Sequence, residues 1–266
     1  MTTAIPDRRI PVTSAANMRD LGGLPVDGGS IAPGQVYRSA TLAKLSDADG
    51  QRLVELGIET VYDLRTAAER DGAPDRLPAQ ITAVALDVLA DSPLAAAANI
   101  NALLADPAQL AAALQGRQAE DLLRESYRDI VRLPSALRAY RSMYLHLADE
   151  TRNGAALVHC TTGKDRTGWA AASLLTLLGA DGDVVRADYL QTNQDLLPAL
   201  QPMIDRATAL GLDPERLVGV LGVRESYLDA AFDEVASRYG SIEDYLVKGL
   251  ELDADVIDRL RTRFIR

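Results

Sequence analysis

The chain is poor in the residue types that disulfide, metal and membrane proteins need. Its 266 residues include one cysteine, Cys160, so no internal disulfide can form and nothing calls for an oxidising compartment. With two histidines and no ligand-spaced cluster, we expect no metal and no other cofactor. No run approaches the roughly 18 apolar residues of a membrane span, and Asp7, Arg8 and Arg9 stand where a signal peptide needs apolar residues. We therefore expect a cytoplasmic protein without integral membrane contact.

Positive charge is also scarce. The chain has 28 Lys+Arg residues against 38 Asp+Glu residues, and its net charge of -10 repels nucleic acids and anionic membrane surfaces. We expect no nucleic-acid partner. Hydrophobic residues make up 47% and charged residues 25%, which is the balance of an ordinary globular protein. Because we find no internal repeat and no low-complexity linker, we predict a single domain over residues 1–266.

Hydrophobic and turn patterns predict alternating strands and helices in the first half of the chain. Turn formers between residues 10 and 34 indicate an irregular segment with a short hairpin. A helix is expected to begin after Ser46 and to end at Gly57. Short apolar runs predict buried strands at residues 35–39, 58–64, 81–86 and 155–159. This alternation indicates an α/β fold with a central parallel sheet flanked by helices.

Helical signals dominate the rest of the chain. Ser92-Pro93 and Asp106-Pro107 each pair an N-cap with a proline at the first helical position, which predicts two helices within residues 92–131. These are either core helices or an insertion that covers a pocket. Apolar residues spaced by three and four predict a core helix within residues 135–149. Further helices are expected at 167–178, after Pro198, after Pro214 and at 225–239.

The most informative segment, residues 155–168, places a cysteine between a strand and a helix. The apolar strand ends at His159, a polar loop follows, and an apolar helix comes next. This order gathers backbone N–H groups and a helix N-terminus around one volume that suits a tetrahedral phosphate. The helix field, together with Lys164 and Arg166, favours the thiolate form of Cys160 over the thiol. Cys160 is therefore a candidate nucleophile.

The other loop residues fit the hydrolysis of a phosphate ester. The planar guanidinium of Arg166 can grip two phosphate oxygens at once, which lysine cannot do as well. Cys160 would attack phosphorus in line, and water would then hydrolyse the cysteinyl-phosphate. Thr167 can donate its hydroxyl to the departing sulfur, and His159 orders the loop through backbone hydrogen bonds. We expect the remaining loop positions to bind the phosphate: Thr161, Thr162, Gly163, Lys164 and Gly168.

Residues 159–168 resemble the phosphate-binding loop of the cysteine-dependent protein tyrosine phosphatases, and residues 163–168 resemble the bacterial branch of that family. The likeness covers most of the chain except roughly residues 92–132. It includes short motifs at residues 17–23, 36–39, 63–65, 187–190 and 222–224.

This resemblance implies a phosphatase fold, no metal, and hydrolysis of phosphotyrosine in proteins or peptides. Phosphoserine, phosphothreonine and phosphoinositides are additional substrates that the family implies, and phosphate or other oxyanions would bind in the loop. The bacterial branch has a two-helix lid, which favours a lid at about residues 92–131. The branch also implies that export without a signal peptide is an alternative to the cytoplasm.

The sequence leaves open which group protonates the leaving oxygen as general acid. Many tyrosine phosphatases carry this acid in a Trp-Pro-Asp loop, but Trp169 is the only tryptophan and is not followed by Pro-Asp. Asp165 lies inside the loop, where it can donate the proton or hold its neighbours. Asp87 and Asp91 follow the strand at residues 81–86 and could reach the loop from its rim. All three remain candidates.

Two charge pairs and two other functions also stay open. Arg19 with Asp20, and Asp63 with Arg65, either support the loop or form ordinary turn and surface pairs. A rhodanese-like sulfurtransferase also carries a cysteine between a strand and a helix, but the arginine and lysine of this loop favour phosphate. A phosphate-binding module without turnover is the other alternative. Such a module would need no Thr167 hydroxyl to assist the departure of sulfur, so the presence of this hydroxyl argues against it.

Overall fold

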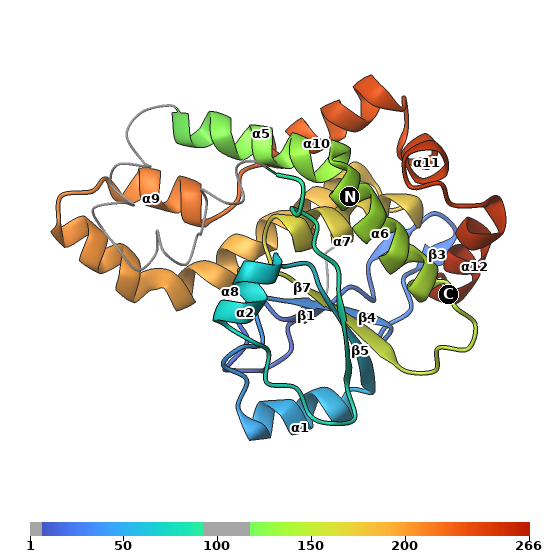
Figure 1. Ribbon diagram of the computed structural model, residues 1–266, viewed down its shortest axis with the longest axis horizontal. Helices are drawn as coiled ribbons and strands as arrows, with labels where there is room; N and C mark the ends of the chain where they lie inside the picture. The colour runs from blue at the N-terminus through green and yellow to red at the C-terminus, as the bar shows by residue number, and fades with distance from the viewer. Residues whose placement is uncertain (1–6, 93–117) are drawn as a thin grey trace.

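The structure is a computed structural model, which describes residues 7–92 and 118–266 (Figure 1). Its centre is a five-stranded sheet in which four strands run parallel. Across the sheet the strands are β1 (Arg19–Asp20), β4 (Val36–Ser39), β7 (Ala155–His159), β5 (Ile58–Asp63) and β6 (Thr82–Ala85). The predicted α/β fold is confirmed, with one difference. The short edge strand β1 pairs with β4 in the antiparallel sense.

The register of the sheet brings the carboxyl ends of three strands to one level. Ser39 of β4 and Asp63 of β5 both lie opposite His159, the last residue of β7. Loops that follow the carboxyl ends of parallel strands share one edge of the sheet. Cys160 directly follows His159, so the residues after β4 and β5 are its neighbours.

Strand side chains alternate between two helical layers. Tyr37, Val61 and Leu157 pack in the smaller core, which α1 (Asp47–Glu55) covers. The residues beside them in sequence, such as Tyr62, point into the larger core. Figure 1 shows α1 on one side of the sheet and α5, α6 and α7 on the other. Helices that contribute to the larger core include α5 (Gln118–Arg132), α6 (Pro134–Leu147), α7 (Arg166–Leu177), α8 (Gly182–Ala209), α10 (Glu225–Arg238) and α12 (Ala254–Phe264).

Local signals explain several of these elements. Ser46 caps α1 and Asp213 caps α9 (Pro214–Leu221), each by accepting a backbone hydrogen bond. The hairpin predicted within residues 10–34 is confirmed as β2 and β3. Its strands are Pro25–Val26 and Gly29–Ser30. Short elements that the patterns did not predict are α2 (Ala67–Gly72), α11 (Ile242–Asp244) and the π-helix Tyr245–Gly249.

The predicted start of a helix after Pro198 is wrong, because one continuous helix, α8 (Gly182–Ala209), runs through that residue and through Pro202. A proline inside a helix removes a hydrogen bond and costs about 3 kcal/mol. Ile204 of α8 packs with Leu217 of α9 in a separate apolar cluster, and this burial offsets the cost. No helix in the described part of the chain, α8 included, combines the length and apolar character that crossing a membrane requires.

Most of the segment predicted as a lid, residues 93–117, lies outside the described residues, so the lid stays a prediction. Residues 118–131 of the predicted segment belong to α5, whose Tyr127, Ile130 and Val131 are buried. The ring of Tyr127 lies 5.9 Å from that of Tyr227 on α10. Helix α5 is therefore packed into the larger core.

Candidate active site

The cysteine loop occupies residues 160–165, between the end of β7 and the start of α7 (Figure 1). Gly163 has φ +68, and a Cβ atom there would lie 2.3 Å from the backbone oxygen of Ser39. Only glycine fits, because other residues rarely adopt this φ and β4 runs too close for a side chain. The predicted order of strand, loop and helix is confirmed.

Cys160 lies at the base of this loop and is 1% exposed. The Thr167 hydroxyl, in the first turn of α7, is buried and has no hydrogen-bond partner in the described part of the chain. Its proton is therefore available to a sulfur or oxygen atom in the loop. Tyr140 of α6 steadies the same turn by donating its hydroxyl to the Arg166 carbonyl oxygen at 3.0 Å.

Arg166 is held by a carboxylate that the sequence patterns did not single out. Glu69 of α2 accepts hydrogen bonds from Nη1 at 2.6 Å and from Nη2 at 2.8 Å. Nη1 also donates to the carbonyl oxygen of Leu64 at 3.3 Å. Nε of Arg166 has no protein partner among the described residues. The N–H groups on that side are therefore not used by any described residue, and their geometry suits the oxygens of a phosphate.

A local capping box puts Glu69 in place. Thr66 caps α2 by accepting from the Glu69 backbone N–H, and the Glu69 carboxylate accepts from the Thr66 backbone N–H. Burial raises the pKa of Glu69, but the hydrogen bonds and charge of Arg166 outweigh it and lower the pKa to about 2. Burial lowers the pKa of Arg166, while Glu69 and negative charge at Cys160 raise it above its usual value. The Thr-x-x-Glu pattern is the sequence signal that could have identified Glu69.

Side chains from outside the loop hold its backbone. Arg38 of β4 donates Nη2 to the Gly163 carbonyl oxygen at 2.8 Å, and Asn17 donates Nδ2 to the same oxygen at 3.0 Å. Arg19 of β1 donates to the Asn17 side-chain oxygen and so orients that amide. Arg19 thus belongs to the support of the loop, whereas the Asp20 carboxylate accepts the backbone N–H groups of Gly22 and Gly34.

A buried carboxylate joins these arginines. Asp188 of α8 accepts hydrogen bonds from Arg8 at 2.6 Å, Arg19 at 3.1 Å and Arg38 at 2.8 Å. Burial raises the pKa of Asp188, but the charges of the three arginines lower it far below its usual value. Asp195, 3.4 Å from Arg19, adds a second carboxylate. Asp195 also pairs with Arg9 at 2.6 Å. Four arginines therefore face two carboxylates behind the loop, and the surplus of positive charge favours a phosphate dianion.

His159 lies beside a second buried cluster. Its Nδ1 is 3.1 Å from the Cys160 carbonyl oxygen, and its Nε2 is 3.0 Å from Oδ2 of Asp75. His159, Asp75 and Asp63 are close enough together to hold a metal ion. However, Nη2 of Arg65 lies 2.7 Å from the Asp63 carboxylate and 2.9 Å from that of Asp75. The guanidinium already supplies the positive charge, and Asp63 with Arg65 forms an interior pair.

Lys164 makes contacts other than the predicted one with phosphate. Its buried Nζ donates to the carbonyl oxygens of Val220 at 2.7 Å and Gly222 at 3.2 Å, at the end of α9. Carbonyl groups at the carboxyl end of a helix attract a positive charge. Nζ also lies 3.4 Å from Oδ1 of Asp165. Lys164 therefore joins the loop to α9, and phosphate binding by its side chain stays a prediction.

The remaining loop residues contact the same network. The Thr161 hydroxyl donates to the Glu69 carboxylate. The Thr162 carbonyl oxygen accepts from Nδ2 of Asn17 at 3.3 Å. Gly168 allows the ring of Tyr189 on α8 to approach the helix backbone, since a Cβ atom at residue 168 would lie 3.2 Å from that ring. Each side chain or carbonyl group thus helps to set the shape of the loop.

The three candidate acids lie in different surroundings. Asp165 is in the loop, its side chain is 20% exposed, and its Oδ1 accepts from the Tyr127 hydroxyl at 2.8 Å. Asp87 accepts the backbone N–H of Ala67 at 2.9 Å, which ties it to the start of α2. Asp91 lies 3.2 Å from the guanidinium of Arg138 on α6. Asp165 is therefore the candidate whose position in the chain joins it directly to the cysteine loop.

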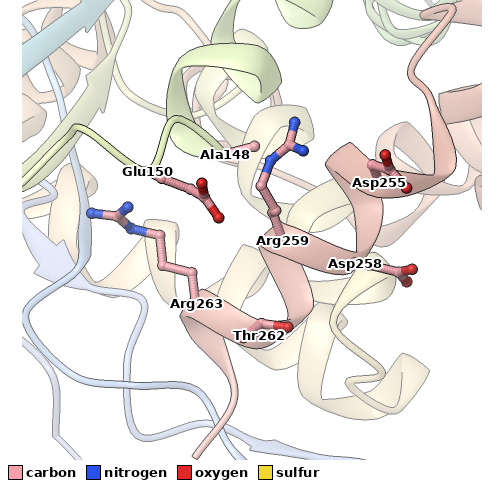
Figure 2. A pocket seen from close by; sticks show the side chains of 7 residues that line it. All are labelled: Ala148, Glu150, Asp255, Asp258, Arg259, Thr262 and Arg263. Atoms are coloured by element: carbon pink, nitrogen blue, oxygen red, sulfur yellow. The ribbon is translucent and has the colours of Figure 1, made fainter.

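A cavity of about 410 Å³ lies elsewhere on the surface (Figure 2). Glu150 precedes the amino end of β7, whereas Cys160 follows its carboxyl end, so the cavity is at the opposite edge of the sheet. Figure 2 shows Arg259 and Arg263 of α12 on either side of Glu150. The lining carries three carboxylates and two guanidiniums, and Cys160 is not part of it. The lining residues are Ala148, Glu150, Asp255, Asp258, Arg259, Thr262 and Arg263.

A phosphate group in the loop would meet backbone N–H groups at the start of α7, the Nε side of Arg166 and the sulfur of Cys160. Such a cradle around a nucleophilic sulfur is the reaction centre of the cysteine-dependent phosphatases.

Comparison with known proteins leads from this class to a family. The family model described as the tyrosine phosphatase family matches residues 10–266. The chain is 35% identical to a protein of Cupriavidus necator that is provisionally named a tyrosine-protein phosphatase, over 90% of this chain and 82% of that protein. It is 32% identical to the triple specificity protein phosphatase PtpB of Mycobacterium tuberculosis, over 96% of this chain and 97% of that protein. A tyrosine-protein phosphatase of Nostoc commune is 29% identical, over 85% and 72% respectively. This chain belongs to the tyrosine phosphatase family, and it is an enzyme that hydrolyses phosphoric monoesters.

Proposed function

We propose that the chain removes phosphate from tyrosine side chains of proteins and peptides through a cysteinyl-phosphate at Cys160. The observation that carries this proposal is the placement of Cys160 at the base of the loop and of Arg166 in the first turn of α7, where Glu69 holds both Nη atoms and Nε has no protein acceptor among the described residues. The thiolate attacks phosphorus in line, so the S–P bond forms as the P–O bond to tyrosine breaks. The loop N–H groups from Thr161 onward and the Arg166 guanidinium hold the other phosphate oxygens.

Asp165 is our choice for the proton transfers, because it lies in the loop itself. It protonates the departing tyrosine oxygen, and its carboxylate then accepts a proton from the water that attacks the cysteinyl-phosphate. The P–S bond breaks in this second step and releases inorganic phosphate. The unpartnered hydroxyl of Thr167 donates to the departing sulfur and makes it a better leaving group. Asp87 and Asp91 are the alternatives against which the role of Asp165 is tested.

The range of substrates is part of the same proposal. A relative is named for triple specificity, and we extend to this chain the hydrolysis of phosphoserine, phosphothreonine and phosphoinositides. Rates for a phosphotyrosine peptide, a phosphoserine peptide and a phosphoinositide, measured side by side, test this range. We place the protein in the cytoplasm, with export as the alternative, and cell fractionation distinguishes the two.

Hydrolysis of para-nitrophenyl phosphate tests the central claim. Cys160→Ser should lower turnover by more than about 1000-fold, because a hydroxyl is a poor nucleophile at neutral pH. The variant should still bind a phosphotyrosine peptide through the loop N–H groups. Arg166→Lys should lose most of the rate, since one ammonium cannot replace two parallel hydrogen bonds. Turnover by Cys160→Ser within about tenfold of wild type, or cyanide-dependent use of thiosulfate, would contradict the proposal.

A further inference from the structure

A chain of two buried phenols ends on Asp165. Tyr127 of α5 donates its hydroxyl to Oδ1 of Asp165 at 2.8 Å. The hydroxyl oxygen of Tyr189 on α8 lies 2.6 Å from that of Tyr127. Tyr127 has one hydroxyl proton and gives it to Asp165, so its oxygen accepts the proton of Tyr189. The chain therefore has one direction, from Tyr189 through Tyr127 to the carboxylate.

The packing around Tyr127 holds its hydroxyl in place. The ring is fully buried, meets the ring of Tyr189 edge-on at 6.2 Å, and lies 5.9 Å from the ring of Tyr227. Burial raises the pKa of both Tyr127 and Tyr189 well above the usual value, so both phenols keep their protons at neutral pH. Tyr127 is thus a fixed, neutral donor to Asp165.

The two oxygens of Asp165 have different partners. Oδ1 receives the Tyr127 hydroxyl and lies 3.4 Å from Nζ of Lys164. Oδ2 has no hydrogen-bond partner in the described part of the chain, and the side chain keeps 20% of its surface exposed. Donors at Oδ1 leave Oδ2 as the oxygen that can carry and transfer a proton.

We propose that Tyr127 is a positioning residue, which holds Oδ1 so that Oδ2 of Asp165 exchanges the proton with the leaving group. This inference rests on the proposed function. In the first step the P–O bond breaks and the proton on Oδ2 moves to the leaving oxygen. In the second step Oδ2 takes a proton from the attacking water as the P–S bond breaks. Tyr189 acts one bond further away, by orienting the Tyr127 hydroxyl.

Tyr127→Phe tests this inference, because it removes the hydroxyl and keeps the buried ring. A substrate with a poor leaving group needs the proton, whereas one with a good leaving group does not. We expect kcat/KM for phenyl phosphate to fall by about 10-fold to 100-fold, since misplaced catalytic groups cost up to about 100-fold. The value for para-nitrophenyl phosphate should fall by less than about 3-fold. Tyr189→Phe should show the same pattern with a smaller loss.

Tyr144→Phe is the matched control. Tyr144 is an equally buried phenol on α6 that bonds Ser173 at 2.7 Å, so its variant should hydrolyse both substrates like wild type. Vanadate inhibition and thermal unfolding of each variant report on the loop and the fold. If Tyr127→Phe does not fold, Tyr189→Phe decides by the same comparison of substrates.

The outcomes separate the inference from the proposed function. Equal losses for both substrates in the phenol variants would overturn the positioning role of Tyr127. If Asp165→Asn shows the leaving-group dependence and Tyr127→Phe does not, this inference fails while Asp165 keeps its role. If Asp165→Asn shows no such dependence, the inference fails together with the assignment of the acid. The cysteinyl-phosphate mechanism itself is tested separately, by the turnover of the Cys160→Ser variant.

Discussion

Arg166 presents two sides of its guanidinium, and each has a different use at this site. The two Nη atoms bind the Glu69 carboxylate at 2.6 Å and 2.8 Å, while the side with Nε faces no protein acceptor among the described residues. A guanidinium oriented in advance loses little conformational freedom when phosphate arrives. Glu69 thus positions Arg166 without taking part in the bond changes.

Glu69→Gln should therefore impair catalysis while leaving the fold intact. The neutral amide cannot hold both Nη atoms, so Arg166 loses its set orientation, and we expect kcat with para-nitrophenyl phosphate to fall about 10-fold. Glu55→Gln is the control, because its ion pair with Arg52 is about half exposed on both sides and contributes under about 1 kcal/mol. A Glu69→Gln enzyme as active as Glu55→Gln would show that Arg166 needs no such anchor.

Gly163→Ala should disable the loop by sterics. The new Cβ would lie 2.3 Å from the Ser39 oxygen at a φ of +68. The loop must shift to relieve this contact, and a displacement near 1 Å can cost about 100-fold in kcat/KM. Gly182→Ala, where the added atom meets open space, is the matched control and should keep wild-type activity. Equal kcat/KM for the two variants would contradict this account of the loop.

At the scale of elements, the loop is supported by helices and strands that are remote in sequence. Helix α2 supplies Glu69, α5 supplies Tyr127, and the end of α9 binds Lys164. Strand β4 supplies Arg38, which α8 holds through Asp188. Five elements outside the loop therefore contribute to its shape through polar contacts, and each contact is buried or partly buried.

Asp188→Asn should weaken the attachment of α8 to the sheet and lower the stability of the fold. Arg8, Arg19 and Arg38 would lose their shared charge partner, and breaking a buried ion cluster costs about 3–5 kcal/mol. Urea unfolding should show this loss in the free energy of unfolding. In contrast, Asp229→Asn removes an exposed pair with Arg186 and should cost under about 1 kcal/mol. Similar urea midpoints for unfolding of the Asp188→Asn and Asp229→Asn variants would mean that the three arginines find other charge partners.

At the scale of the whole molecule, buried carboxylates link stability to pH. For Asp188, Glu69 and Asp63, burial raises the pKa, but neighbouring arginines lower it more. These groups bind protons more readily in the unfolded chain, so their stabilisation is complete above the unfolded pKa and is lost as pH falls through the folded one. Burial raises the pKa of Asp20, which acts in the opposite direction.

The free energy of unfolding should therefore change little between about pH 7 and about pH 5 and fall steeply below about pH 4.5. Glu69→Gln provides the specific check, since Glu69 has a folded pKa of about 2 against an ordinary 4.5. The difference in the free energy of unfolding between this variant and wild type should be constant above about pH 4.5, the ordinary pKa of Glu69. It should shrink as the pH falls toward about 2, the pKa of Glu69 in the folded protein. A difference that does not depend on pH would contradict the assigned shift.

Patterns within a few residues were enough to predict several parts of this molecule. Helix-start signals act on the adjacent turn, so Ser46 predicted the start of α1 and Pro214 predicted the start of α9. The apolar strand before Cys160, the glycine in the loop and the apolar helix after it also carry local signals. They placed Cys160, the proposed nucleophile, and Arg166 at the two ends of one loop. Sequence alone therefore determined the fold class, and it supplied the candidate nucleophile and the candidate phosphate-binding arginine of the proposed reaction.

Only the tertiary structure decided which distant groups meet that turn. Glu69 lies 97 residues from Arg166, Tyr127 lies 38 residues from Asp165, and Asn17 lies 146 residues from Gly163. Such contacts follow from sheet register and helix packing, which no local pattern encodes. The same reason explains why α8 continues through Pro198, since burial against α9 outweighs a local helix-breaking preference. The sequence by itself identified the proposed reacting groups. The packing of remote elements decided which side chains bind them, because a buried charge is stable only beside a partner and the fold determines which partner is near.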